Sequence, residues 1–203
     1  RNSGQTCICA NRILVQDGVY DAFVEKLTAL VGSFRVGDGL DETTTHGPLV
    51  NEAAVADVDA FVRDALDKGA KAPIGGRRSE LGSCYYELTV LTDVTEDMRV
   101  FREEIFGPVA PIFRFRTEEE AIAMANDTPY GLASYFYTRD LGRAWRVAEA
   151  IEYGLVGINE VAITSDVIPF GGVKESGQGR EGSKYGIDDY VEIKYICMGG
   201  IDR

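Results

Sequence analysis

The sequence predicts an α/β fold, a mostly parallel open sheet with helices on both faces. Short apolar runs alternate with segments of helical periodicity along most of the 203 residues. The apolar runs are nearly continuous, which is typical of strands buried on both faces. This β-α alternation indicates a sheet that is covered by the helices between its strands.

The strands are predicted from their runs of apolar and β-branched residues. They lie at 12–15, 85–94, 108–115, 132–137 and 155–158. The helices are predicted from apolar side chains at spacings of three and four. They cover 19–31, 55–66, 121–125 and 141–151.

Capping residues mark the ends of several predicted helices. Asp17 is placed to cap the first helix and Asp140 to start the last. Thr117 and Glu120 form a capping box ahead of the third helix. Gly69 is a suitable stop for the second helix.

Two segments depart from this alternation. Residues 171–182 contain five glycines in twelve positions, which excludes the interior of a regular element. Residues 190–198 alternate weakly and are predicted as a terminal strand. An uncovered edge strand is a liability in a monomer, so we expect this segment to pair with a neighbouring subunit of a homo-oligomer.

Composition excludes several classes of partner. The net charge of −12 argues against nucleic acid and anionic membranes, which both require a basic surface. The sequence has no apolar run of the roughly 18 residues that a membrane span needs. Four cysteines without a disulfide pattern favour a reducing, cytoplasmic setting. A single histidine and scattered cysteines give no metal-site spacing, so no metal is expected.

Three motifs contain residues capable of chemistry. Cys7 and Cys9 follow a Gly-Gln-Thr turn, whose small residues permit close approach of a ligand. The backbone N–H of Cys7 could donate a hydrogen bond to an oxyanion. From spacing alone, two ordinary buried packing thiols before a strand are favoured, because free cysteines are usually packing residues. The adjacent Glu103 and Glu104 would ordinarily form a solvated charged pair. PFGGVKESGQGRE lacks the strand and helix of a dinucleotide fingerprint.

In combination and in this order, NSGQTC, EEIFGPV and PFGGVKESGQGRE resemble the aldehyde dehydrogenase superfamily over essentially the whole chain. NRILVQ and GREGSKYGIDDYVEIKY are similar, more narrowly, to its succinate-semialdehyde dehydrogenase group. The resemblance implies an oxidoreductase that uses NAD or NADP and acts on a small aldehyde with a carboxylate.

The resemblance also assigns roles to the reacting and cofactor-binding residues. Cys7 matches the nucleophile, whose thiohemiacetal becomes a thioester once hydride passes to the nicotinamide. Cys9 matches a redox partner that closes a reversible disulfide with Cys7. Glu104 matches the carboxylate that holds the ribose next to the nicotinamide, and Phe106 the aromatic residue beside it, with a plain core role as the alternative for Phe106.

Substrate-binding residues follow from the same resemblance. Arg1 occupies the place of an arginine that faces the substrate carboxylate, a group that a guanidinium recognises through two hydrogen bonds. Thr164 or Ser165 would supply a hydroxyl to the same carboxylate, with simple loop solvation as the alternative. Phe170 matches an aromatic residue of the substrate tunnel.

The resemblance predicts a catalytic domain at 1–182 and an oligomerisation arm at 183–203, with the N-terminal cofactor-binding domain absent from this chain. We therefore expect little or no dehydrogenase activity from these residues alone. The alternatives are a dehydrogenase for another acid semialdehyde, such as glutarate semialdehyde, and a non-enzymatic redox or metal-binding thiol module.

Overall fold

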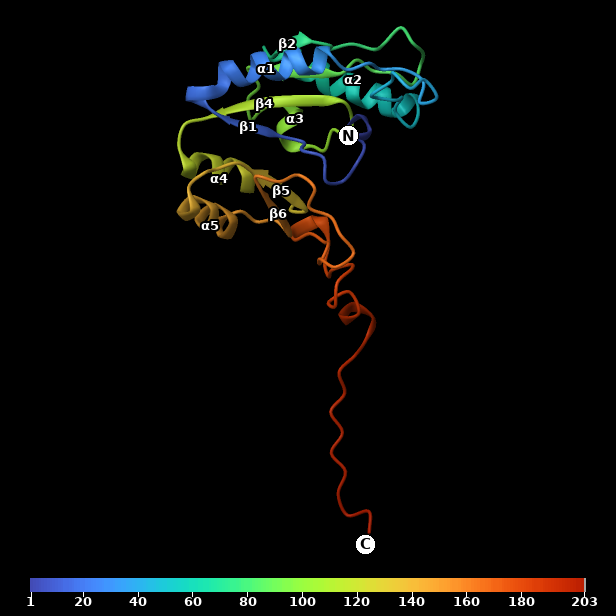
Figure 1. Ribbon diagram of the computed structural model, residues 1–203, viewed down its shortest axis with the longest axis vertical. Coiled ribbons are helices and arrows are strands. Elements are labelled where there is room, and N and C mark those ends of the chain that lie inside the picture. The colour runs from blue at the N-terminus through green and yellow to red at the C-terminus, as the bar shows by residue number, and fades with distance from the viewer. Residues whose placement is uncertain (203) are drawn as a thin grey trace. The chain divides into compact units, whose positions relative to one another are not determined.

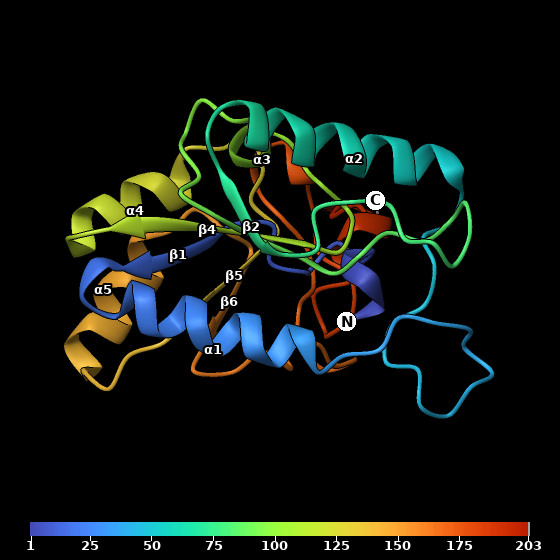
Figure 2. The same cartoon turned by 90° about the horizontal axis from the view of Figure 1, so that it is seen from above.

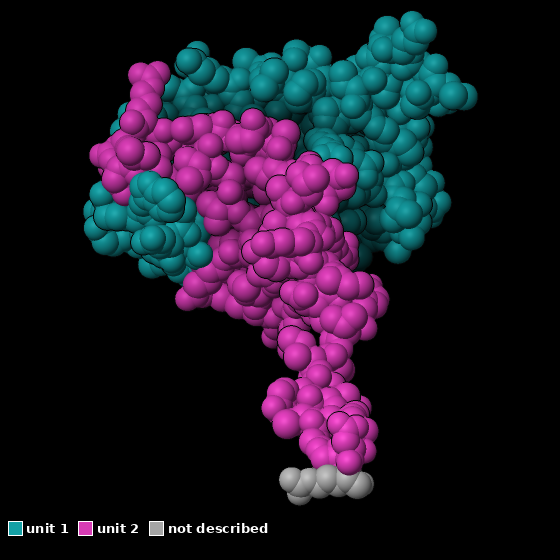
Figure 3. Space-filling view, turned by 60° about the horizontal axis from the view of Figure 1, so that its bottom comes forward, with its two compact units in different colours: residues 1–128, 145–151 teal, residues 129–144, 152–203 magenta. Residues whose placement is uncertain are grey.

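The computed structural model describes residues 1–202 (Figure 1). These residues form two compact units, coloured separately in Figure 3. Unit 1 comprises residues 1–128 and 145–151, and unit 2 comprises 129–144 and the residues from 152 onward. The predicted boundary between a catalytic domain and an arm at 182/183 stays a prediction.

Unit 1 contains a four-stranded sheet in the order β1-β4-β3-β2. The strands are β1 Ile13–Gln16, β2 Lys71–Ile74, β3 Thr89–Thr92 and β4 Val109–Phe115. Strand β4 is parallel to both β1 and β3, whereas β2 joins β3 in the antiparallel direction. The predicted mostly parallel sheet is confirmed. Strand β2 was not predicted, because its four residues KAPI include a proline and a lysine.

Helices cover both faces of this sheet (Figure 2). They are α1 Tyr20–Gly32, α2 Glu52–Asp67, α3 Arg99–Arg102 and α4 Glu118–Asn126. Neighbouring strand residues point to opposite sides. Val90 and Ile112 therefore lie in the core cluster beneath α1, while Leu91 and Phe113 lie in the cluster with the apolar residues of α2 and α3.

Unit 2 contains the parallel pair β5 Ala133–Phe136 and β6 Leu155–Ile158. Helix α5 Leu141–Ala150 follows β5 and contributes residues to both units. As predicted, segment 171–182 contains no α-helix or strand. The chain also has short 3-10 helices at η1 Asn2–Gly4, η2 Asp17–Val19, η3 Lys174–Ser176 and η4 Asp188–Tyr190.

Of the three residues predicted to cap the N-terminus of a helix, Thr117 and Asp140 are confirmed. The Thr117 hydroxyl accepts the N–H of Glu120, and Asp140 accepts the N–H of Arg143. The capping box is only half formed, because the Glu120 carboxylate accepts the N–H of Arg116 at 2.7 Å rather than that of Thr117. The cap at Asp17 is wrong: η2 precedes α1, and the Asp17 carboxylate instead accepts a hydrogen bond from Arg114 at 2.9 Å. Arg114 belongs to β4 and is 97 positions away from Asp17 along the chain. The local sequence around Asp17 therefore does not reveal this contact.

Two predicted strands also differ from the structure. The strand predicted at 85–94 is β3, which covers only Thr89–Thr92. It is shorter because Tyr86 pairs with Arg78 in an isolated bridge and Asp93 has a positive φ of 55°. The terminal strand predicted at 190–198 is not formed within the described chain: Tyr190 belongs to η4, and residues 191–198 have no regular structure. A strand needs a neighbour to complete its hydrogen bonds, so pairing with another subunit stays a prediction. No helix within residues 1–202 is long and apolar enough to cross a membrane.

Candidate active site

The loop that carries the two thiols is anchored to the segment at 47–50. Ser3 is buried and donates its hydroxyl hydrogen bond to the carbonyl of Gly47 at 2.9 Å. The side-chain oxygen of Gln5 accepts the N–H of Val50 at 2.9 Å. Contacts from residues more than forty positions away therefore fix the backbone ahead of the first cysteine.

The two thiols lie in different environments, although both are free. Cys7 is exposed, so the alternative of a buried packing thiol is wrong for it. Cys9 is half-buried, with its sulfur against the Thr6 hydroxyl and 3.6 Å from the Arg1 carbonyl oxygen. The guanidinium of Arg1 makes no hydrogen bond or ion pair with the residues that the structure describes. Cys7 is thus open to reagents, and the Arg1 side chain is available to a ligand.

Asn11 connects the thiol loop to the Glu104 segment. Its side-chain oxygen accepts the N–H of Ile105 at 2.8 Å, and its amide group donates to the carbonyl of Glu103 at 3.0 Å. The two bonds clamp the backbone on both sides of Glu104. Asn11 was not among the predicted site residues, and the signal was a polar amide just before a buried strand.

Backbone packing between the two segments is close enough to require glycine. Gly4 has a φ of +77°, and a Cβ there would lie 2.0 Å from the carbonyl oxygen of Gly107. A Cβ on Gly107 would lie 2.3 Å from the Val58 side chain. Since neither position accepts a side chain without movement, the thiol loop lies directly on the EEIFGPV segment.

A small pocket of about 20 Å³ lies between these two segments. It is lined by Gly4, Thr6, Cys9, Ala10, Asn11, Glu104, Phe106, Gly107 and Val109. Phe106 is 45% exposed and adopts a positive φ of 49°, so the core role considered for it is wrong. Unit 1 therefore brings together three of the predicted site residues, Cys9, Glu104 and Phe106.

The adjacent carboxylates of Glu103 and Glu104 differ in their partners. Glu103 accepts two hydrogen bonds from the guanidinium of Arg99, at 2.8 and 2.9 Å, and this pairing holds the pKa of Glu103 below its ordinary value. Glu104 is exposed and forms no hydrogen bond or ion pair with the described part of the chain. An unpaired carboxylate beside an exposed aromatic ring fits the diol and ring of a nicotinamide riboside.

The remaining predicted residues belong to unit 2. Phe170 is half-buried, and its backbone pairs with Glu181 in both directions, at 2.9 and 2.7 Å. Thr164 and Ser165 are both exposed. The Ser165 hydroxyl donates to the carboxylate of Asp166 at 3.1 Å. The roles of Thr164, Ser165 and Phe170 toward a substrate stay predictions.

The chain matches the model of the aldehyde dehydrogenase family over residues 1–196. It belongs to the aldehyde dehydrogenase family. A mitochondrial succinate-semialdehyde dehydrogenase of Arabidopsis thaliana is 60% identical over 203 residues, which are 100% of this chain and 38% of that protein. A glutarate-semialdehyde dehydrogenase of Pseudomonas aeruginosa is 59% identical over 201 residues, 99% of this chain and 42% of that protein.

Solved structures of the family have the same fold. The crystal structure of succinate-semialdehyde dehydrogenase from Burkholderia pseudomallei superimposes with a TM-score of 0.95 and 59% identity, over 98% of this chain and 41% of that chain. The resemblance inferred from the motifs is thereby confirmed at the level of the family. This aldehyde dehydrogenase chain spans about two fifths of the length of these relatives.

Proposed function

We propose that this chain supplies the nucleophile and part of the cofactor-binding surface of an NAD(P)-dependent aldehyde dehydrogenase that oxidises succinate semialdehyde to succinate. The observation that best supports this is an accessible thiol, Cys7, on a loop packed against the segment that carries the unpaired Glu104. A dehydrogenase for glutarate semialdehyde is the second candidate, because a relative of that name is nearly as similar as the first.

In the proposed reaction the Cys7 thiolate forms a bond to the aldehyde carbon, and the carbonyl electron pair moves to oxygen. The backbone N–H of Cys7 donates to no acceptor among the described residues, so it is available to this oxyanion. A bound nicotinamide would supply the acceptor for the hydride of the thiohemiacetal carbon, and the loss of that hydride would leave a thioester on Cys7. Water then cleaves the thioester on Cys7, which releases the acid and restores the thiol.

Two residues of this chain fit the cofactor. The Glu104 carboxylate would accept hydrogen bonds from the ribose hydroxyls beside the nicotinamide, and the exposed Phe106 ring would lie beside that moiety. Both NAD and NADP carry this ribose, so these contacts serve either cofactor.

Arg1 is proposed to recognise the substrate carboxylate. In the complete gene product, Arg1→Met is expected to raise KM for succinate semialdehyde about 10- to 100-fold, the range expected for a charge-assisted hydrogen-bonded pair. KM for butanal, which lacks the carboxylate, should change less than about twofold. Steady-state kinetics with both aldehydes measures the difference.

The matched control is Arg35→Met, which removes another exposed arginine, one that pairs with Asp41. It should leave both KM values unchanged. If Arg1→Met raised KM equally for the two aldehydes, or for neither, Arg1 would not bind the substrate carboxylate.

Cys7 and Cys9 are proposed to form a reversible disulfide under oxidation. Peroxide would convert the exposed Cys7 thiolate to a sulfenic acid, and attack by Cys9 would expel water and close the S–S bond. Peptide mass spectrometry after peroxide treatment should find a Cys7–Cys9 crosslink that dithiothreitol removes and that is missing in Cys9→Ser. Failure to find it in the native sequence would eliminate the switch.

A further inference from the structure

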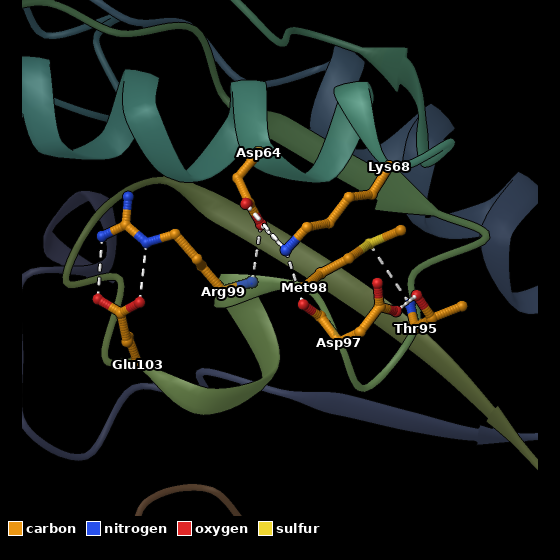
Figure 4. Close-up of polar contacts among 7 residues, drawn as sticks. All are labelled: Asp64, Lys68, Thr95, Asp97, Met98, Arg99 and Glu103. Carbon is orange, nitrogen blue, oxygen red and sulfur yellow. Dashed lines mark hydrogen bonds and ion pairs between the residues drawn. The ribbon is translucent and has the colours of Figure 1, made fainter.

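Arg99 pairs with Glu103, the first of two neighbouring carboxylates (Figure 4). Its guanidinium binds both carboxylate oxygens of Glu103, through Nε at 2.8 Å and Nη2 at 2.9 Å. Glu103 has extended backbone angles, φ −112° and ψ 153°, and successive side chains of extended backbone point to opposite sides. The next residue, Glu104, instead lines the pocket beside the thiol loop.

The position of Arg99 is set by α2 rather than by its own short helix. Helix α3 has four residues, too few to be stable alone. The Asp64 carboxylate accepts the backbone N–H of Arg99 at 2.8 Å, and the Arg99 guanidinium lies over the Phe61 ring at 4.4 Å. Lys68 contacts Asp64 at 3.0 Å and donates to the carbonyl of Asp97 at 2.7 Å (Figure 4).

Asp64 remains ionised in this arrangement. Burial raises its pKa, but the hydrogen bonds from the Arg99 N–H and from Lys68 outweigh that effect and leave the pKa below its ordinary value. A charged carboxylate thus holds the first residue of α3, and α3 in turn presents the guanidinium to Glu103. The chain of contacts runs from α2 through Arg99 to the residue preceding Glu104.

We infer that Arg99 is a positioning residue for the cofactor: it commits Glu103 to α3 and leaves Glu104 as the member of the pair that receives the ribose. This inference rests on the proposed function. Without Arg99, two adjacent carboxylates would be free, and the added negative charge would oppose a dinucleotide that carries a diphosphate.

Carboxyl labelling with a carbodiimide and glycine ethyl ester, read by peptide mass spectrometry, tests the first step. In the complete gene product, Glu104 should be labelled at least about fivefold faster than Glu103, because Arg99 occupies both carboxylate oxygens of Glu103 and keeps that group ionised. In Arg99→Met the two rates should become equal. Methionine keeps an apolar contact with the Phe61 ring, and the backbone bond to Asp64 does not depend on the side chain.

Cofactor binding tests the second step. Titration of NAD(P)H fluorescence should give a Kd about fivefold higher in Arg99→Met, since exposed charges interact with this order of strength. The double variant Arg99→Met/Glu103→Gln should return the Kd to within about twofold of wild type, because it removes the unpaired charge. Glu103→Gln alone should bind like wild type.

Arg146→Met is the matched control, because Arg146 binds both oxygens of Glu118 in the same manner at 2.9 and 3.1 Å. It should change neither the labelling at Glu103 and Glu104 nor the Kd. Melting temperatures of all variants are measured to detect loss of folding.

Equal labelling of Glu103 and Glu104 in the wild type would overturn the inference. So would a double variant that keeps the whole defect of Arg99→Met, since Arg99 would then be structural only. Bound cofactor should also protect Glu104 from labelling. Missing protection would contradict the proposed function of Glu104, and this result is distinct from the contrast between the two glutamates.

Discussion

Replacement of Cys7 by serine is expected to lower kcat of the complete gene product by at least about a thousandfold. A serine hydroxyl at the same place is almost fully protonated at neutral pH. Among the described residues no histidine adjoins it, because His46 contacts Thr45 and Phe34 instead. Steady-state kinetics with succinate semialdehyde measures the loss. The Kd for NAD(P)H should change less than about twofold, because cofactor contacts are assigned to other residues.

Cys197→Ser is the control for this variant. Cys197 is also free and exposed, but it lies in the segment after η4. Its replacement should leave kcat unchanged. Substantial turnover by Cys7→Ser, or equal losses in both variants, would remove Cys7 from the proposed chemistry.

Gly4→Ala is expected to lower kcat/KM about a hundredfold, the usual consequence of moving a reacting group by about 1 Å. The new methyl group would lie 2.0 Å from the Gly107 carbonyl oxygen, so the thiol loop must move away from the EEIFGPV segment. The backbone angle adds to the effect, because a φ of +77° is strained for alanine by about 1–2 kcal/mol. The loop that carries Cys7 would lose its register with Glu104.

Gly18→Ala is the matched control, since a Cβ at Gly18 meets no atom within 4 Å. It should retain wild-type kcat/KM, and both variants should keep the cooperative melting of the core. The iodoacetamide reaction rate of Cys7 reports the loop itself and should change only in Gly4→Ala. A Gly4→Ala enzyme with unaltered kcat/KM would show that the close approach to Gly107 is not needed.

Much of the fold could be predicted from local sequence. The apolar run LVGI predicted a strand, and it forms β6. The position of Thr117 three residues before Glu120 predicted a helix cap, and its hydroxyl caps α4. The errors arise where a distant partner decides. The Asp17 carboxylate accepts a hydrogen bond from Arg114 instead of capping α1. Residues 191–200 have no strand partner within the described chain.

The candidate site shows the same division. Cys7, Glu104 and Phe106 could be proposed because they stand in recognisable motifs. Asn11 could not, since its role depends on Glu103, 92 residues away along the chain. The role of Arg99 could not be predicted either, because an arginine and a glutamate four residues apart ordinarily form a surface pair. Only the contact of Asp64 in α2 with the first residue of α3 connects this pair to the placement of the guanidinium beside Glu103.

The most direct test of the account is to capture the covalent intermediate on Cys7. The complete gene product is mixed with succinate semialdehyde and cofactor, quenched in acid within the first turnovers, digested and examined by mass spectrometry. A succinyl group is expected on the peptide that contains Cys7, and it should be absent when cofactor is omitted and absent in Cys7→Ser. An active enzyme whose succinyl group appears on another residue, or on none at any quench time, would contradict it.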